Sequence, residues 1–490
     1  MSLPSQVAVP VEMQVGRLGS SLPHEARSQP FKLFPTGTNS VSSTFTIVGS
    51  SVPQNDQSFP ATPIIFDLPC GNSPDMFLDN RFSTINYRMT VSVATAGTSC
   101  VVASGFLRSS AYSFFDRMYI TSQNGQILED IGEYGVVADT LINLQMSPAL
   151  RQSLSPMMGF NSTFDNNQGV SLGIFTSNTF VAGQNESHSF SVPLISSLLG
   201  ATANNMPNLG RTSKLQLVLQ TASILPLTVL TGAVTTGGTY TVTLSDFSLS
   251  LETISIGLPA LQMIDSTMAV DAMGNKNAYY SGITYRTTTN TIPAGSSGTF
   301  SSICGLRGSS VKSLFARFLD TGTNSLANSV NQKYDSKNPN LNSINFNLGG
   351  VRFPPTPVNP LLNPSLAFRE LQMAIGSFNS SSFQCSNSGR YSILAAGGTA
   401  TTLTTAINTQ DYIWTLGSSV SQLCQFVFGS NVEIIARRGI FSGQNCNNIN
   451  IILEGNIGTA NTNLITSYIV AMLDVIFIHN VMTGDISVRI

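Results

Sequence analysis

The sequence has little charge. Asp, Glu, Lys and Arg together make up 10% of its 490 residues, whereas an ordinary soluble domain has about 25%. Hydrophobic residues make up 42% and the formal net charge is −2, which is unlike a disordered chain and unlike a dedicated nucleic-acid binder with its basic patch. A chain with so few charges is predicted to cover much of its surface with copies of itself, although a secreted adhesin or lectin can be equally charge-poor.

Residue types that form metal and redox sites are also scarce. The three histidines, His24, His188 and His479, are far apart in the sequence. No two cysteines form a C-x-x-C pair, which argues against a zinc knuckle or a redox motif. Because six cysteines are few for a chain of this length, we expect reduced, buried thiols rather than a disulfide framework. They are Cys70, Cys100, Cys304, Cys385, Cys424 and Cys446.

Catalytic motifs are missing as well. The sequence contains no H-E-x-x-H, G-x-S-x-G or G-x-x-x-x-G-K-[ST] pattern. Acids could still pair in space, as they do in glycosidases, but ordinary roles at strand ends and helix turns are favoured for them. The candidates are Asp116, Glu129, Asp130, Glu133, Asp246, Glu252, Glu433 and Asp474. We therefore predict no catalytic, cofactor-binding or metal-binding residues, and we do not expect an enzyme.

Three smaller features leave alternatives open. Arg437-Arg438-Gly439 is interpreted as a solvated turn, in preference to a contact with a neighbour or with nucleic acid. Met146, Met157 and Met158 are consistent with an adaptable contact surface or with internal packing. The single tryptophan, Trp414, has no aromatic cluster beside it, which disfavours the alternative function of a carbohydrate-binding or hydrolytic β-sandwich protein.

Targeting and membrane-spanning segments are not evident. The first residues lack a basic stretch followed by an apolar one, and no run of 18 apolar residues occurs. The most apolar tract, residues 468–482, is interrupted by Asp474 and His479. We therefore expect synthesis in the cytosol without a helical membrane span. The glycosylation patterns at Asn161, Asn185 and Asn379 are then chance matches.

The sequence is rich in short β-like runs separated by turn signals. Residues 247–251 (FSLSL) alternate strictly between apolar and polar, as a strand with one buried face does. An Asn124-Gly125 turn signal follows the run at 114–121. The predicted strands include 43–48, 83–94, 114–121, 214–219, 240–244 and 247–256, and then 278–287, 310–319, 343–347, 391–394, 432–436, 449–453, 467–478 and 486–490.

Two helices are predicted, one in each half of the chain. Residues 127–145 have apolar side chains at helical spacing, and residues 364–374 begin with a proline, as helices often do. The proline-rich residues 1–43 predict an extended N-terminal arm that is ordered only against neighbours.

The layout of the two halves predicts an all-β fold of two tandem eight-stranded jelly-roll β-sandwiches with a few short helices in loops. The predicted divisions are the arm at 1–43, a first jelly roll at 44–257, a connection at 258–274 and a second jelly roll at 275–490.

Several segments resemble the double jelly-roll major capsid proteins of polinton-like viruses, virophages and related DNA viruses. Residues 114–129 (FFDRMYITSQNGQILE) and then 131–134 (IGEY) resemble that family's strand, Asn-Gly turn and I-x-E-Y pattern. Residues 192–200 (VPLISSLLG), followed by Met206-Pro207 and 214–219, resemble a second landmark. Later landmarks are resembled by residues 344–348, Arg352-Phe353-Pro354 and Ser442-Gly443. The resemblance covers most of the chain beyond the arm.

This resemblance implies two jelly rolls side by side and a homotrimer that forms a pseudo-hexagonal capsomer of an icosahedral virion shell, made in the host cytoplasm. It also implies contacts with neighbouring trimers and with minor capsid and penton proteins. The helix-bearing insertions and the connection near Pro259 are the expected interface regions. The arm would lie on the inner side, where Arg17, Arg27 and Lys32 are too few for strong phosphate binding. No cofactor and no specific nucleic-acid site are expected.

Overall fold

The structure is a computed structural model of the chain. It describes residues 26–46, 60–95, 102–107, 110–145, 153–154, 156–159, 185–223, 227–231, 239–268, 270, 274–320, 336, 338–376, 426–434, 442–458, 460–461 and 464–490. Among these residues, no helix is both long enough and apolar enough to cross a membrane.

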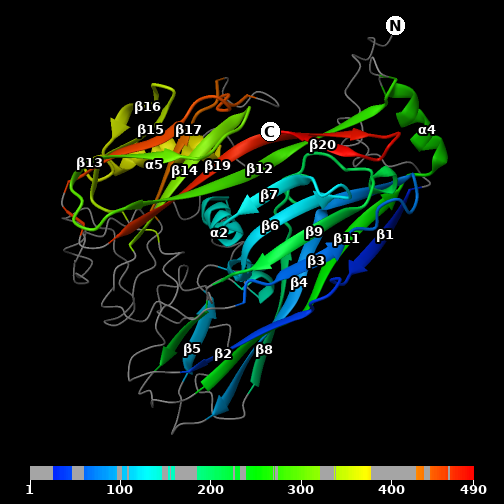
Figure 1. The fold of residues 1–490 in the computed structure, drawn as a ribbon, viewed down its shortest axis with the longest axis horizontal. Coiled ribbons are helices and arrows are strands. Elements are labelled where there is room, and N and C mark those ends of the chain that lie inside the picture. Colours follow the sequence, from blue (N-terminus) through cyan, green and yellow to red (C-terminus); the bar gives the residue numbers. More distant parts are fainter. Residues whose placement is uncertain are drawn as a thin grey trace.

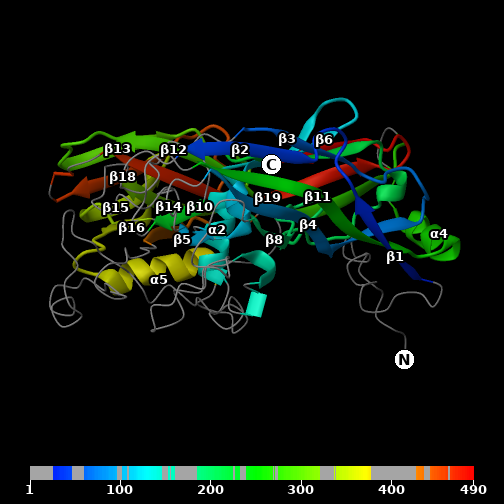
Figure 2. The same cartoon turned by 90° about the horizontal axis from the view of Figure 1, so that it is seen from below.

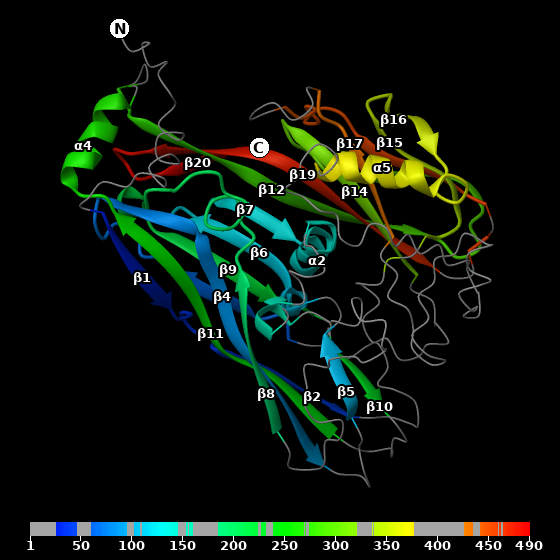
Figure 3. The same ribbon diagram turned by 180° about the vertical axis from the view of Figure 1, so that it is seen from behind.

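The first sandwich consists of two antiparallel sheets. One sheet has the order β1-β11-β4-β8, with β2 also paired to β11; the other has the order β3-β9-β6-β7. The strands of the first sheet are β1 (Arg27–Leu33), β2 (Ser40–Thr46), β4 (Met76–Thr95), β8 (Asn185–Pro193) and β11 (Thr239–Ser255). Those of the second are β3 (Pro63–Asp67), β6 (Phe115–Ser122), β7 (Ile127–Gly132) and β9 (Leu215–Thr221). A ribbon of β5 (Val102–Leu107) and β10 (Leu227–Thr231) lies beyond them (Figure 3).

The second sandwich repeats this arrangement. Its sheets have the orders β12-β19-β14-β17, with β20 paired to β19, and β13-β18-β15-β16. The first of these contains β12 (Asn277–Ile292), β14 (Val311–Asp320), β17 (Val427–Asn431), β19 (Ile465–Asn480) and β20 (Ile486–Arg489). The other contains β13 (Gly298–Cys304), β15 (Leu341–Leu348), β16 (Val351–Val358) and β18 (Ile451–Ile457).

The two sandwiches have the same topology. When β1 and β2 are counted together as the first strand, and the β5–β10 ribbon and β20 are set aside, each sandwich has eight strand positions in the described residues. In both, one sheet has the order first-eighth-third-sixth and the other second-seventh-fourth-fifth. This is the winding of a jelly roll, and the predicted all-β double jelly-roll fold is confirmed.

The predicted N-terminal arm differs from the structure in its described part. β1 pairs with β11 from Arg27↔Ser255 to Leu33↔Leu249, and β2 pairs with β11 further along. Together they occupy the place that β12 holds in the second sandwich. The reason is that β11 needs a partner on this edge for its backbone groups, so residues 27–46 belong to the sheet and the predicted boundary at residue 44 was too late. Residues 1–25 lie outside the described residues.

Both predicted helices exist, but the first is shorter than expected. Residues 127–132 form β7, which returns along β6 after the turn at Asn124-Gly125, and Glu133 then adopts a positive φ of 48°. Although the side chains have helical spacing, residues 127–132 pair as a hairpin with β6. The helix α2 (Tyr134–Gln145) therefore begins later than predicted. α5 (Pro364–Ile375) agrees with the prediction. Each of these helices follows the fifth strand of its sandwich.

Two smaller predictions fall differently. The predicted strand at 432–436 lies just after the observed β17, which ends at Asn431. The predicted strand at 391–394 lies outside the described residues. A third helix, α4 (Leu258–Thr267), occupies part of the predicted connection between the sandwiches. The other predicted divisions remain predictions.

One long ribbon runs across both sandwiches (Figure 1). β12 and β19 pair from Asn277↔Asn480 to Ile292↔Ile465, and at about 3.3 Å per residue such strands extend roughly 50 Å. One end of the ribbon pairs with β14 in the second sandwich. The other end contributes Tyr280 and Phe477 to the hydrophobic core of the first sandwich. Figure 2 shows the resulting elongated molecule, with α4 at one end and β13 at the other.

We predict that deleting residues 1–35, which removes β1, destabilises the first sandwich. Phe31 and Leu33 of β1 pack against the core. With about 1.5–3 kcal/mol for a fully buried large apolar side chain, the loss of these partly buried ones should lower the free energy of unfolding by roughly 2–4 kcal/mol. Urea unfolding measures it, and deletion of residues 1–25 is the control, with a much smaller effect expected. Equal effects of the two deletions would contradict the role of β1.

Candidate functional site: the contact between the two sandwiches

The histidines do not form the start of a metal site. His188 lies on β8 and His479 on β19, and His24 lies outside the described residues. Within the described part of the chain, no three His, Cys, Asp or Glu side chains are arranged so that they could hold a metal ion. Cys70, Cys304 and Cys446 are free thiols. Burial raises the pKa of the Cys70 and Cys446 thiols to about 11 and that of Cys304 to about 12, as expected of unreactive thiols.

The candidate acids are mostly held in ordinary structural contacts. Asp130 pairs with Arg117 and Asp246 with Arg88 at the surface. Asp116 accepts hydrogen bonds from Ser223, and Glu252 accepts one from Ser28. Glu133 lies at the positive-φ position between β7 and α2. None of these four contacts joins two of the candidate carboxylates.

Two of the candidate acids, Glu433 and Asp474, have the same lysine as a partner. The Lys312 ammonium lies 3.7 Å from a Glu433 oxygen and 3.0 Å from an Asp474 oxygen. Ser442 and Ser310 donate to the two carboxylates. Because a lysine lies between the acids and their oxygens accept from serines, this group neutralises buried charge and ties neighbouring strands together, which is a structural role.

Other sequence candidates give less information. Trp414, Met146 and residues 437–439 lie outside the described residues. Met158 is buried and Met157 packs against the same core, so this part of the methionine run is internal packing.

The two sandwiches are joined by residues that the sequence analysis did not assign to any site. The segment after β8 forms an isolated antiparallel bridge with β12 at Ala203↔Gly282. The Ile283 amide donates to the Thr202 carbonyl (3.0 Å) and the Asn204 amide to the Ser281 carbonyl (2.9 Å). Gly282 makes this approach possible, because a Cβ at that position would lie 2.5 Å from the Ser197 carbonyl oxygen. The side chain of Asn205 accepts from the Ser281 amide at 2.8 Å.

Glu129 is a buried carboxylate at the middle of this contact. It lies on β7 of the first sandwich and accepts hydrogen bonds from Ser196 Oγ (2.5 Å), from the Ser197 amide (2.8 Å) and from Thr284 Oγ1 of β12 (3.0 Å). Burial raises the pKa of the Glu129 carboxyl, and these hydrogen bonds act in the opposite direction. Hydrogen-bond donors from both sandwiches therefore meet at one buried carboxylate, that of Glu129.

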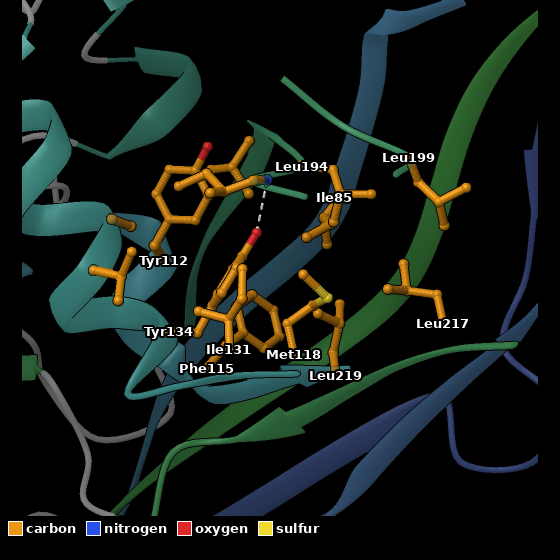
Figure 4. Close-up of a cluster of buried hydrophobic side chains, with 14 of the residues drawn as sticks. Ile85, Tyr112, Phe115, Met118, Ile131, Tyr134, Leu194, Leu199, Leu217 and Leu219 are labelled. Atoms are coloured by element: carbon orange, nitrogen blue, oxygen red, sulfur yellow. Dashed lines mark hydrogen bonds between the residues drawn. The ribbon is translucent and has the colours of Figure 1, made fainter. Parts of the chain in front are cut away.

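The aromatic side chain at the start of α2 anchors the same region. Tyr134 is fully buried among Ile131, Phe115 and Met118, and its hydroxyl accepts a hydrogen bond from the Ile195 amide at 2.8 Å (Figure 4). Burial raises the pKa of the Tyr134 hydroxyl well above its usual range. This bond holds the segment after β8 in position, next to the serines that donate to Glu129.

Arg317 and Asp139 form a buried ion pair between the sandwiches. Arg317 lies on β14 and Asp139 on α2, their closest atoms are 2.7 Å apart, and each side chain is 2% exposed. The same Arg317 nitrogen donates to Thr140 Oγ1 at 3.1 Å. Removing one partner of a buried ion pair leaves an uncompensated charge away from water, which is strongly destabilising, so this pair ties α2 to β14. A cavity lined by Thr140, Tyr285 and Met472 lies in this region between α2 and the second sandwich.

His479 lies at the other end of the contact, near α4. Its Nδ1 lies 3.1 Å from the Tyr280 hydroxyl and its Nε2 lies 3.3 Å from the Arg211 carbonyl oxygen. The Tyr280 hydroxyl also accepts from the Asn208 amide. A neutral imidazole protonated at Nε2 satisfies all of these partners. Burial lowers the pKa of His479 to about 4, with a further lowering from the Arg211 charge.

Arg211 extends this end of the contact to α4. Its guanidinium forms two hydrogen bonds with the Asp265 carboxylate, at 2.6 and 2.7 Å, a bidentate pair that fixes both position and orientation. The Lys276 ammonium donates to the Asp265 carbonyl oxygen. The helix between the sandwiches is therefore attached to both of them.

No protein-family model matches the sequence, and no curated protein matches it. Among the solved structures that match, three are similar over nearly the whole chain. A cryo-EM structure of the Sputnik virophage has a TM-score of 0.53 and 14% identity, covering 96% of this chain and 89% of that one.

A model of the PBCV-1 virus capsid has a TM-score of 0.52 and 11% identity, covering 95% of this chain and 97% of that one. PBCV-1 VP54, fitted into a reconstruction of the virophage Sputnik, has a TM-score of 0.50 and 11% identity, covering 95% and 98%. At these identities the likeness is one of fold. The predicted resemblance to the double jelly-roll capsid proteins is confirmed at that level.

We predict that Arg317→Ala lowers the free energy of unfolding by about 3–5 kcal/mol, because it leaves the Asp139 carboxylate buried without its partner. The double variant Arg317→Met with Asp139→Leu should recover most of that loss, because no charge is then buried. Chemical unfolding measures both. Arg352→Ala is the matched control, since its pair with Glu454 is exposed and should contribute at most about 1 kcal/mol. Equal effects at Arg317 and Arg352 would contradict the assignment.

We predict a loss of stability in acid that depends on His479. Its pKa of about 4 in the folded chain is below the value of about 6.5 in an unfolded chain. Its contribution is therefore fully present above about pH 6.5 and is lost as the pH falls toward 4, by roughly 3 kcal/mol. Urea unfolding at pH 7 and pH 4.5 should show a smaller acid loss in His479→Gln than in the parent. His188→Gln is the control, and an unchanged acid loss in His479→Gln would refute the prediction.

Proposed function

We propose that this chain is a major capsid protein, whose copies form homotrimeric, pseudo-hexagonal capsomers that tile an icosahedral virus shell. The observation that carries the proposal is the pair of jelly rolls with identical topology, held in one arrangement as in structures of the Sputnik virophage and of the PBCV-1 capsid. The proposed role is structural and not enzymatic.

Geometry supports a trimer as the tile. Each copy contributes two blocks of the same topology, so three copies around a threefold axis place six similar blocks in a ring. Such a ring has nearly sixfold outer sides although its true symmetry is threefold, and repeated contacts between tiles can then cover a surface. Since a tile must keep its angles while many weak contacts add up, the buried contact between the blocks suits this role.

The chemistry of the surface supports assembly. The charged fraction of 10% means that few charges need to lose water when copies meet, and burying a charge costs more than burying a hydrogen-bonded amide or hydroxyl. Large apolar side chains such as Leu258, Met263, Ile303 and Leu362 are also exposed in the single chain. We propose that α5 and the connection near Pro259 contribute to contacts between copies, whereas the described side chains of α2 are almost all buried within the subunit.

The proposed partners follow from this role. They are other copies of the chain, within the trimer and between trimers, together with minor capsid and penton proteins. The proposed location is the virion shell, after synthesis in the host cytoplasm. No specific nucleic-acid site is proposed, and the positive charges in residues 1–43 would support only a weak contact on the inner side.

The experiment is to purify the full-length chain and measure its mass in solution by light scattering, followed by negative-stain microscopy. We expect a particle of three times the chain mass with a six-lobed outline, and larger tiled arrays at high concentration. Arg352→Ala, which alters an exposed ion pair, is the control for variants such as Arg317→Ala. A protein that stays monomeric at every concentration, or that forms only dimers, would count decisively against the proposal.

A further inference from the structure

A lysine and two carboxyl groups meet in the second sandwich, where β17, β14 and β19 are neighbouring strands (Figure 1). Lys312 lies on β14, Asp474 on β19, and Glu433 just after the end of β17. Their side chains are 15%, 6% and 5% exposed, so water has little access to them. A buried arginine such as Arg317 stays ionic because it cannot lose its proton, whereas a lysine amine can also act as a nucleophile.

A β-bulge directs the Lys312 side chain toward Asp474. The pairing of β14 with β19 shifts register between Val311 and Ser313, which leaves Lys312 as the extra residue. Bulges of this kind re-aim one side chain and are frequent next to active sites. The Lys312 Nζ atom lies 3.0 Å from Asp474 Oδ1, which is bonded to the carboxyl carbon. Since reacting atoms are poised at about 3–3.5 Å from one another, a small movement brings the amine onto that carbon.

Ser310 holds the other oxygen of the same carboxyl group. Its hydroxyl donates to Asp474 Oδ2 at 2.8 Å, and its own oxygen accepts a hydrogen bond from the Gly443 amide at 3.0 Å. A donor on this oxygen stabilises the negative charge that develops there when a nucleophile adds to the carboxyl carbon. The amide can approach because residue 443 is glycine: a Cβ at that position would lie 2.5 Å from the Val311 carbonyl oxygen.

Glu433 is in a position to move protons at the lysine nitrogen. Its Oε1 atom lies 3.7 Å from Lys312 Nζ and accepts a hydrogen bond from the Ser442 hydroxyl at 2.7 Å. The 3.7 Å separation exceeds a hydrogen bond, as contacts of catalytic acids and bases often do before the reaction begins. The Lys312 nitrogen therefore has two different neighbours: a carboxyl group that it can attack and a second one that can take its proton.

We propose that Lys312 and Asp474 form an amide bond between their side chains, with Glu433 as the catalytic residue that carries the proton. A proton first passes from the Lys312 ammonium to Oδ1 of the Asp474 carboxylate, and the neutral amine then adds to the carboxyl carbon. Glu433 takes a proton from the nitrogen and gives it to the departing Oδ1 hydroxyl. One C–N bond forms, one C–O bond breaks and one water molecule leaves, so no oxidant or metal is needed.

This amide bond links two strands of the second sandwich covalently. Because β14 and β19 are already paired, the bond closes without a change of fold, and the exclusion of water from the site protects it from hydrolysis. All of the reacting groups belong to one chain, so the bond forms in a monomer as well as in an assembled shell.

The mass of the full-length protein tests the bond directly. Mass spectrometry of the purified, denatured chain should give a mass lower than that of its sequence by one water molecule. After digestion with trypsin, residues 308–317 should be found joined to residues 439–489, because an amidated Lys312 is not cleaved. Lys214 is the internal control: it lies 3.3 Å from Asp67 in a pair whose side chains are 54% and 36% exposed, and it should be cleaved normally.

Variants distinguish the bond from an ordinary ion pair. Lys312→Arg keeps the positive charge but should have the full mass of its own sequence. Asp474→Asn should still close, losing ammonia in place of water, and reach the same mass as the closed parent. Glu433→Gln should contain at least about tenfold less of the joined peptide, since a general acid–base group contributes about 100-fold or more to a rate. A parent chain of full mass with a free peptide 308–312 would overturn the proposal, and so would a Glu433→Gln chain that closes as completely as the parent.

Discussion

The arrangement of this molecule depends on a set of buried polar groups that have their partners on opposite sandwiches. Glu129 accepts from Thr284, Arg317 pairs with Asp139, and the imidazole of His479 bonds to the Arg211 carbonyl. Burying any of these groups without its partner would lower the stability of the folded chain. Apolar surfaces alone can slide past one another, but satisfied polar pairs specify one register and one angle. The β12–β19 ribbon, which is part of both hydrophobic regions, adds a continuous backbone connection.

This constraint links the fold to the proposed shell. A tile transmits its shape to its neighbours, so an error in the angle between its blocks would accumulate across the lattice. Placing charge inside the subunit, where Arg317 and Lys312 are paired, and little of it outside is consistent with copies that meet over uncharged sides. The buried Glu129 carboxylate has the chemistry of a catalytic group. Its hydrogen bonds instead hold the two sandwiches in a fixed relative position.

Specific elements show where sequence reasoning succeeded and where it did not. The strand at β6, the Asn-Gly turn and α5 were predicted because their signals are local. The start of β7 was mistaken for helix, because Leu128 and Ile131 fit helical spacing while the decisive pairing with β6 involves the backbone. β1 was missed because Pro30 and the charged Arg27 and Lys32 argue against a central strand, yet an edge strand tolerates them. The residues of the inter-sandwich contact were not identified as a group, since Asp139 and Arg317 are separated by most of a sandwich in the sequence.

The sequence by itself determined the fold class and the absence of recognisable catalytic motifs, because strand periodicity, turn residues and composition are properties of short segments. Its resemblance to capsid proteins pointed to the double jelly roll for the same reason. Only the tertiary structure decided which acids and bases pair, why Gly282 must lack a side chain, and how the two sandwiches are joined. Those features depend on contacts between residues far apart in the chain, and burial makes such contacts specific, since a charge or amide removed from water must find a partner where the fold places it.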